Sequence, residues 1–182
     1  MGSDCQYAFD GQGATRHHQL DRQWRISLIK KIISGGQSGA DIAGIDAAMA
    51  NNFPYGGWIP KDRRVEDSHL SEKYQLQKLP VSGYAEWTEQ NVIDSDGTVI
   101  FVHGRLSGDS DLTRKLAEKH DRPWLHLNMK EHTIQEAVER LSEWCSENQI
   151  EILNVAGRSA SKDPDIYIVT YKVVGGLLKK AE

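Results

Sequence analysis

Cysteine, long apolar runs and an excess of basic charge are all scarce or missing in this sequence. Its 182 residues include two cysteines, Cys5 and Cys145, which lie far apart and lack the spacing of metal ligands. We therefore expect no disulfide framework, and a reducing cytoplasm is the simplest compartment. No apolar run approaches the roughly 18 residues that a membrane-spanning helix needs. The formal net charge of −4 argues against a general nucleic-acid binder, which would carry a basic stripe or excess.

The chain divides into a short arm and one domain. Residues 1–25 are polar, contain glycine and show no helix or strand period, so we predict a flexible N-terminal arm outside the fold. The adjacent His17 and His18 have no third ligand nearby, and such pairs are usually solvated rather than metal-bound. The remainder, 26–182, suits a single domain with a sizeable core.

Apolar strands alternate with amphipathic helices from residue 26 onward. In the first predicted helix, Ile42, Ile45, Ala48 and Met49 recur at helical spacing. Strands alternating with helices indicate βαβ units around a mainly parallel sheet, which is an α/β fold. The stretch 52–80 is irregular. The predicted strands cover 30–34, 97–103, 123–128 and 150–157, and the predicted helices cover 39–52, 110–121, 133–148 and 165–182.

Glycines follow the first predicted strand. In the stretch ISGGQSGAD, a β-branched run stops at Gly35 and Gly36, and Gly39 comes three residues later, where a helix begins. Ligands of open α/β sheets bind outside the carboxyl ends of the strands. Glycine lets a phosphate approach the backbone, the helix N-terminus offers free N–H groups, and Gln37 and Ser38 add side-chain donors. The alternative is a tight turn in which the glycines serve only conformation.

The dinucleotide fingerprint fits this loop only in part. Ser-x-Gly-x-x-Gly is that fingerprint with serine in place of its first glycine. An acidic residue should follow about 20 residues later to hold a ribose, but this region reads GGWIPKDRR, with Lys61, Arg63 and Arg64. Basic residues near a glycine loop suit phosphate or another oxyanion. Trp58 offers an aromatic wall, and solvated surface is the alternative interpretation for Arg64.

Two further strand ends carry glycine beside hydroxyl or basic residues. The strand before HGRLSGDSDLT leads to Gly108, after which Asp109 or Ser110 can cap the next helix. The last strand ends in NVAGRSASKDP, which contains Gly157 and Arg158. Because the carboxyl ends of parallel strands share one edge, three such loops predict a common crevice.

Acidic residues and histidines form no recognisable catalytic pattern. Asp41 lies in the first turn of the first helix, where a favourable interaction with the helix dipole is reason enough for a carboxylate. No Ser-His-Asp order, HExxH or CxxC motif occurs. The histidines at 69, 103, 120, 126 and 132 are scattered, and none has an obvious partner.

Five segments in chain order resemble the putative molybdenum carrier family, over roughly residues 30–178: SGGQSGAD (34–41), GGWIPKDRRVED (56–67), NVIDSDGT (91–98), GRLSGDSDLT (104–113) and LNVAGRSASKDPDIY (153–167). That family belongs to the Rossmann-like SLOG superfamily, with the lysine-decarboxylase-like nucleotide hydrolases as relatives. The resemblance implies a Rossmann-like three-layer fold and a phosphate-bearing ligand, either the molybdenum cofactor (molybdopterin) or a nucleotide. The residues assigned to the ligand are Gly35, Gly36, Gln37, Ser38, Gly39, Asp41, Trp58, Lys61, Arg63, Arg64, Gly108, Ser110, Thr113, Gly157 and Arg158.

Two turns depart from the patterns of the relatives. The family usually has Gly-Gly-Thr where this chain has Gly108-Asp109-Ser110, and a carboxylate there repels an anion unless Asp109 points away. The superfamily hydrolases resemble one another in a Gly-Gly-x-Gly-Thr-x-x-Glu loop, and the position of their glutamate falls on Thr113, whose hydroxyl cannot replace a carboxylate.

These features predict a non-catalytic carrier or binding protein without a metal site of its own. The alternatives are a nucleotide-processing hydrolase and a nucleotide sensor. The apolar segment IYIVTYKVVGGLLKK near the carboxyl end is also more apolar than a solvated tail, and superfamily relatives commonly associate. We therefore expect a homo-oligomer.

Overall fold

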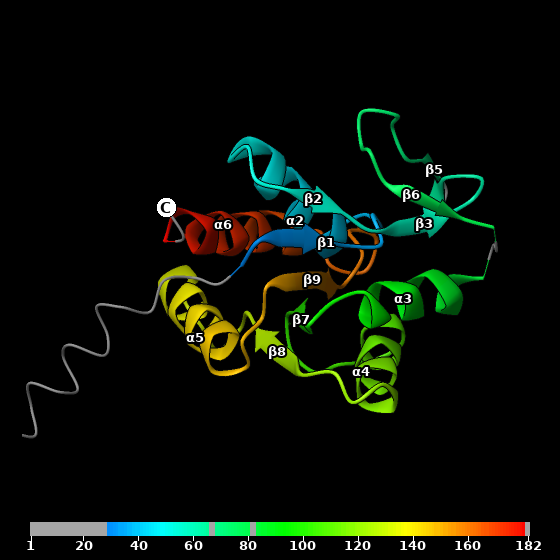
Figure 1. The fold of residues 1–182 in the computed structure, drawn as a ribbon. Helices are drawn as coiled ribbons and strands as arrows, with labels where there is room; N and C mark the ends of the chain where they lie inside the picture. Colours follow the sequence, from blue (N-terminus) through cyan, green and yellow to red (C-terminus); the bar gives the residue numbers. More distant parts are fainter. Residues whose placement is uncertain (1–28, 66–67, 81–82, 181–182) are drawn as a thin grey trace, which may run out of the picture.

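The computed structural model describes residues 29–65, 68–80 and 83–180, and the predicted arm lies outside them (Figure 1). The described helices are α2 (Ala40–Ala50), α3 (Tyr84–Ile93), α4 (Asp109–Lys119), α5 (Ile134–Glu147) and α6 (Ile166–Lys179). The described strands are β1 (Lys31–Ile33), β2 (Tyr55–Gly56), β3 (Trp58–Pro60), β4 (Arg64–Val65), β5 (Ser68–His69), β6 (Gln77–Leu79), β7 (Gly97–Val102), β8 (Trp124–Asn128) and β9 (Ile152–Gly157).

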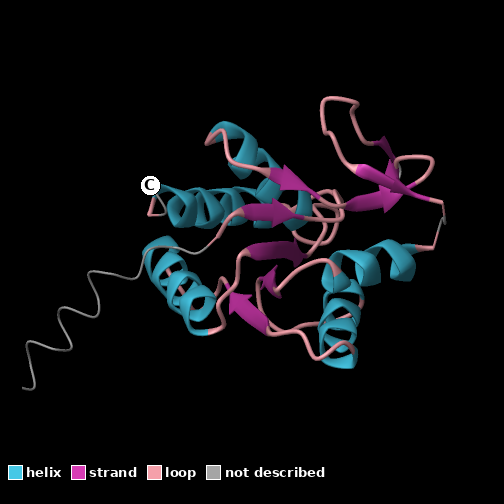
Figure 2. Cartoon of the chain, in the orientation of Figure 1, coloured by secondary structure: helices cyan, strands magenta, loops and turns pink. Residues whose placement is uncertain are grey.

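Five strands form the central sheet, in the order β2-β1-β9-β7-β8. Every pairing in it is parallel, for example Ile32 opposite Leu153 and Phe101 opposite Gly157. Helices α2, α5 and α6 cover one face, and α3 and α4 cover the other (Figures 1 and 2). The predicted three-layer α/β fold with a mainly parallel sheet is thus confirmed. None of the described helices is both long and apolar enough to pass through a bilayer.

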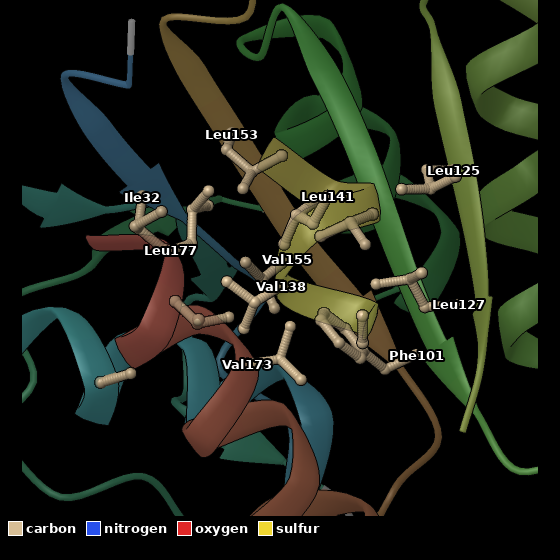
Figure 3. Close-up of a cluster of buried hydrophobic side chains, with 14 of the residues drawn as sticks. Ile32, Phe101, Leu125, Leu127, Val138, Leu141, Leu153, Val155, Val173 and Leu177 are labelled. Atoms are coloured by element: carbon tan, nitrogen blue, oxygen red, sulfur yellow. The ribbon is translucent and has the colours of Figure 1, made fainter. Parts of the chain in front are cut away.

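The larger core lies between the sheet and the α5–α6 pair (Figure 3). Sheet residues such as Phe101 and Val155 meet helix residues such as Leu141 and Leu177, and all four are fully buried. Residues two apart along each strand point to the same face, which explains why alternate positions of β7 and β9 enter this core. The resulting sheet is a rigid platform for the loops at its carboxyl edge.

Helix α6 owes its apolar composition to this core. Ile166, Val173, Val174 and Leu177 are all fully buried, and α6 packs along both α2 and α5. The apolar segment therefore already has a partner inside the chain. This segment therefore gives no support to a homo-oligomer, which stays a prediction.

The irregular stretch 52–80 holds short strands that periodicity does not reveal. Strand β2 joins the main sheet beside β1, while residues 57–65 and 68–80 form an excursion that we call the flap. In the flap, β3 pairs with β6 and β4 pairs with β5. A small apolar cluster fastens the flap to α2: Ile45, Ile59, Leu70, Tyr74 and Leu76. Strands of two or three residues are too short for an alternating pattern, so sequence alone could not predict them.

Candidate functional site

The connections leaving β7 and β9 diverge at the carboxyl edge of the sheet. These strands are neighbours, but β7 leads to α4 on one face and β9 leads to α6 on the other. Open α/β sheets bind ligands at such a topological switch point. A small hollow of about 10 Å³, room for about one water molecule, lies at this point, and we call it the switch-point crevice. It is lined by Ser107, Asp109, Ser110, Gly157, Arg158, Ser159 and Lys162.

Helices α2 and α4 both begin here with a glycine and without a side-chain cap. Gly39 (φ 84°) precedes α2 and Gly108 (φ 54°) precedes α4, and both adopt the left-handed backbone that favours glycine. A Cβ on Gly39 would collide with the backbone of Arg158, whereas a Cβ on Gly108 would meet nothing within 4 Å. Gly39 therefore lets two loops touch, and Gly108 leaves the N-terminus of α4 open to an approaching group.

Arg158 spans the crevice from β9 to the loop that precedes α4. Its Nη2 donates to the carbonyl of Arg105 (3.2 Å) and to Oγ of Ser107 (2.7 Å). Its Nε is buried and has no hydrogen-bond partner within the described part of the chain. A buried donor without a partner is costly, so this N–H is a candidate contact for a ligand. Beside it, Lys162 Nζ lies 2.8 Å from Oδ2 of Asp109.

Asp41 lies beneath the crevice and is 9% exposed. Its carboxylate accepts hydrogen bonds from the backbone N–H groups of Gln37 and Gly157 and from the hydroxyl of Ser34. Burial nevertheless raises the pKa of Asp41 from 3.8 to about 7, because desolvation disfavours the charged form more than these donors stabilise it. The nearby carboxylate of Asp109 raises this pKa further. Asp41 thus does more than interact with the helix dipole, the role expected from the sequence. By accepting hydrogen bonds from Gln37 and Gly157, it links the loops after β1 and β9.

Tyr84, at the start of α3, lies close enough to Asp41 to be affected by its charge. Burial is the main cause that raises the pKa of its phenol, and the negative charge of Asp41 adds to it. The hydroxyls of Thr88 and Thr113 lie within hydrogen-bonding reach of the phenol. Thr113 is therefore a neighbour of the Tyr84 phenol. Its own Oγ1 donates a hydrogen bond to the carbonyl of Asp109 (3.0 Å).

His103 has a partner that sequence reasoning missed. It follows β7, and its Nδ1 lies 2.9 Å from Oδ2 of Asp163, which is in the loop after β9. The backbone N–H of His103 donates to the same carboxylate oxygen. The two residues are 60 positions apart, so only the adjacency of β7 and β9 brings them together. The one sequence signal was that each follows a strand ending at the same edge.

The glycine loop after β1 serves mainly to let protein segments pack closely. A Cβ on Gly36 (φ 68°) would lie 3.0 Å from Leu76 of the flap, and a Cβ on Gly157 would collide with the carbonyl of Phe101. A Cβ on Gly35 would lie 3.1 Å from Oδ2 of Asp41. For these three glycines the structure favours the conformational alternative over close approach of a phosphate.

The polar candidates of the loops also have partners within the protein. Gln37 is buried, and its N–H serves Asp41. Ser38 Oγ accepts from the N–H of Ala160 (3.1 Å), which ties the loops after β1 and β9 together. Ser110 Oγ donates to the carbonyl of Ser107 (2.9 Å) and accepts from its N–H (3.0 Å), so it shapes the entry to α4.

The basic candidates lie on the flap, and one of them needs correction. Arg63 is 6% exposed and donates to the carbonyls of Leu70, Ser71 and Tyr74. Its guanidinium holds the flap together and is not free to supply charge to a ligand. Lys61 and Arg64 are exposed, and within the described residues no hydrogen bond or ion pair joins their side chains to the crevice.

Trp58 is anchored at the junction of the flap and α3. Its indole Nε1 donates to Oδ2 of Asp94 (2.6 Å), and its backbone N–H and carbonyl both pair with the amide of Asn91. These bonds fix the ring beside α3.

Within the described ranges, no cluster of three or more histidine, cysteine, aspartate or glutamate side chains could hold a metal ion. His17 and His18 lie outside those ranges.

A family profile, that of the "Circularly permutated YpsA SLOG family", matches residues 32–178. The chain belongs to this family. It is similar to the crystal structure of the "Putative molybdenum carrier protein" from Syntrophus aciditrophicus SB, with 45% identity and a TM-score of 0.81, over 84% of this chain and 96% of that one. A structure of (E)-4-hydroxy-3-methyl-but-2-enyl diphosphate reductase is 13% identical, with a TM-score of 0.35 over 86% of this chain and 60% of that one, and is too distant to support an argument. No curated protein matches.

The strand order agrees with a circular permutation. If β9 is moved to the front of the chain, the order β2-β1-β9-β7-β8 becomes 3-2-1-4-5, which is that of a doubly wound nucleotide-binding sheet. In that frame, β9 takes the place of the first strand, and the loop from Arg158 to Asp165 takes the place of the first strand-to-helix turn. That turn carries the phosphate-binding loop in dinucleotide folds.

Proposed function

We propose that this chain is a cytoplasmic, non-catalytic binding protein for a phosphate-bearing small molecule, whose phosphate group lies against the switch-point crevice. The observation that carries the proposal is the Nε of Arg158, a buried donor at the edge of the crevice that finds no partner among the described residues. The uncapped N-terminus of α4 adds backbone donors behind Gly108, where a Cβ would meet open space. Together they supply the fixed N–H groups and positive charge that phosphate requires.

The ligand is a nucleotide or the molybdenum cofactor, and not a free oxyanion. Asp109 places a carboxylate beside the crevice, where it would repel a small dianion that filled it. A larger molecule can place its phosphate against Arg158 and the start of α4 and offer hydroxyl or amine donors to that carboxylate. The name of the 45% identical relative, a molybdenum carrier, adds support for the cofactor.

The experiment is isothermal titration calorimetry of the full chain with AMP, molybdopterin, inorganic phosphate and molybdate. We expect AMP or molybdopterin to bind at least ten-fold more tightly than either free oxyanion. Arg158→Ala should weaken that binding roughly 10- to 100-fold, the worth of a hydrogen bond to a charged group. The matched control is Arg122→Ala, because Arg122 donates to the carbonyl of Ile93 away from the crevice. Equal affinities of the parent and Arg158→Ala for the ligand would show that the ligand does not bind at the crevice.

A hydrolase acting on nucleotides is the second candidate, and one observation favours it. Asp41 has a pKa of about 7 beneath the crevice, and this value suits a group that exchanges protons near neutrality. Against it, Asp41 is largely enclosed, and Thr113 occupies the position of the relatives' glutamate. Incubation with nucleoside monophosphates and an assay for free base decides between them. Base release that disappears in Asp41→Asn would make the protein an enzyme.

A further inference from the structure

The His103–Asp163 pair crosses the switch point and leaves one ring nitrogen unused. Nδ1 of His103 lies 3.0 and 2.9 Å from the two carboxylate oxygens of Asp163, so this nitrogen is committed to Asp163. Nε2 has no hydrogen-bond partner among the described residues. It is also not among the buried side-chain atoms that lack a partner, which are Asn154 Oδ1, Arg158 Nε and Thr170 Oγ1. Nε2 is therefore open to solvent.

The pair is linked to the crevice through the loop after β9. His103 follows β7, whose register with β9 ends where Phe101 pairs with Gly157. Asp163 donates its backbone N–H to the carbonyl of Ser159 (3.0 Å), and Ser159 lines the crevice next to Arg158. The imidazole and the unpartnered Arg158 donor thus arise from adjacent strands at the same edge.

We propose that Nε2 of His103 contacts the phosphate group of the ligand, and that Asp163 is a positioning residue that orients the ring. The proposal rests on the proposed function and adds a contact to it. With Nδ1–H donated to Asp163, Nε2 is the ring nitrogen left to meet the phosphate group. A carboxylate in this position fixes the tautomer and the orientation of the ring, as it does behind other functional histidines.

A second histidine–carboxylate pair provides a matched control. His120 Nε2 lies 2.6 Å from Oε1 of Glu89, at the opposite end of α4. Helix α4 has 11 residues, so the control pair lies about 16 Å along the helix from the crevice by the rise per residue. The two pairs also differ in the bonded nitrogen, which is Nδ1 in His103 and Nε2 in His120, so spectra can tell them apart.

The test is a long-range ¹H–¹⁵N spectrum of the seven histidine rings of the full chain, titrated with AMP and with inorganic phosphate. Loss of one ring's signals in His103→Ala assigns His103. We expect an Nδ1–H ring before AMP is added and a shift of its Nε2 signal as AMP saturates, while His120 stays unchanged. His103→Ala should weaken AMP binding about 10-fold, and His120→Ala should not. A shift with both probes places the contact on the phosphate itself.

Asp163→Asn separates positioning from a merely structural role. We expect His103 to lose its fixed Nδ1–H form in this variant and AMP to bind more weakly, with the backbone amide spectrum of the sheet preserved. If the amides of Gly108 and Ser110 shift with AMP but Nε2 of His103 does not, the proposed function survives and this inference is overturned. If no signal at the crevice shifts, the proposed function fails as well.

Discussion

The buried carboxylate of Asp41 should make the stability of this protein depend on pH in an unusual direction. Its pKa is about 7 in the folded chain and 3.8 when exposed to water. Between these values the folded state keeps a proton that the unfolded state has lost, so the free energy of unfolding falls as pH rises. The loss begins near pH 4 and is complete above pH 7, the reverse of the behaviour of a salt-bridged aspartate.

The size of the effect follows from the shift. A change from 3.8 to about 7, at 1.36 kcal/mol for each pKa unit, gives about 4 kcal/mol. The perturbation is Asp41→Asn, which removes the titration. An asparagine also presents an NH₂ group to the N–H donors of Gln37 and Gly157, so the variant loses stability at every pH. The informative quantity is therefore the pH dependence of the difference between parent and variant.

Urea unfolding followed by tryptophan fluorescence between pH 4 and 7.5 measures this difference, since the chain has five tryptophans. The stability advantage of the parent over Asp41→Asn should shrink by up to about 4 kcal/mol across this range. Asp111→Asn is the control: hydrogen bonds from Lys115 and Arg114 lower the pKa of Asp111, so its stabilising effect is lost only below about pH 4, and the difference between parent and Asp111→Asn should stay nearly constant across this range. A difference that is flat or grows with pH would refute the account of Asp41.

Three further predictions can be tested, of which the first two follow from the packing. Gly36→Val should destabilise the fold by roughly 1–3 kcal/mol, because valine is strained at φ 68° and its Cβ would press on Leu76 of the flap; thermal unfolding checks this, and an unchanged midpoint would show that the flap does not pack there. Arg63→Ala should loosen the flap, so that the backbone amides of residues 69–79 exchange hydrogen faster, while the affinity for AMP stays unchanged. Weaker AMP binding without faster exchange would show that Arg63 contacts the ligand. Light scattering should find a homo-oligomer at micromolar concentration, and only monomer would dispose of that prediction.

Local sequence patterns were sufficient for the layers of the fold. The strand predicted at 97–103 is β7, and the helix predicted at 133–148 is α5, because each has a period that survives in isolation. β2 could not be predicted in this way. It has two residues, and it exists because Tyr55 and Gly56 fall opposite Ile32 and Ile33.

The candidate site was predicted at the correct edge of the sheet, but several roles were not. Whether Gly36 faces a ligand or Leu76 depends on the flap, 40 residues later, and no local pattern contains that contact. In the sequence, Arg63 resembles a phosphate ligand, because nothing local shows what its guanidinium binds. Its partners are backbone carbonyls around positions 70–74, and only the fold brings them to it. The His103–Asp163 pair depends on which strands are neighbours.

The permutation explains why no acidic residue follows the glycine loop at the spacing of about 20 residues that is typical of dinucleotide folds. That spacing assumes that the phosphate-binding turn comes first in the chain. Here the turn that takes its place, at Arg158, is the last one, and the loop it touches, with Gly39 and Asp41, lies near the beginning. Motif spacings along the chain therefore do not identify the site in a permuted fold, although the order of the strands in the sheet is preserved.

Native mass spectrometry of the purified chain tests the central claim most directly, because it detects whatever small molecule the crevice retains. The account predicts a non-covalent adduct on the parent that is released on denaturation, contains phosphorus, and is reduced or lost in Arg158→Ala but kept in Arg122→Ala. A parent that carries no adduct even after incubation with AMP or molybdopterin, or an adduct that Arg158→Ala retains as well as the parent does, would contradict it.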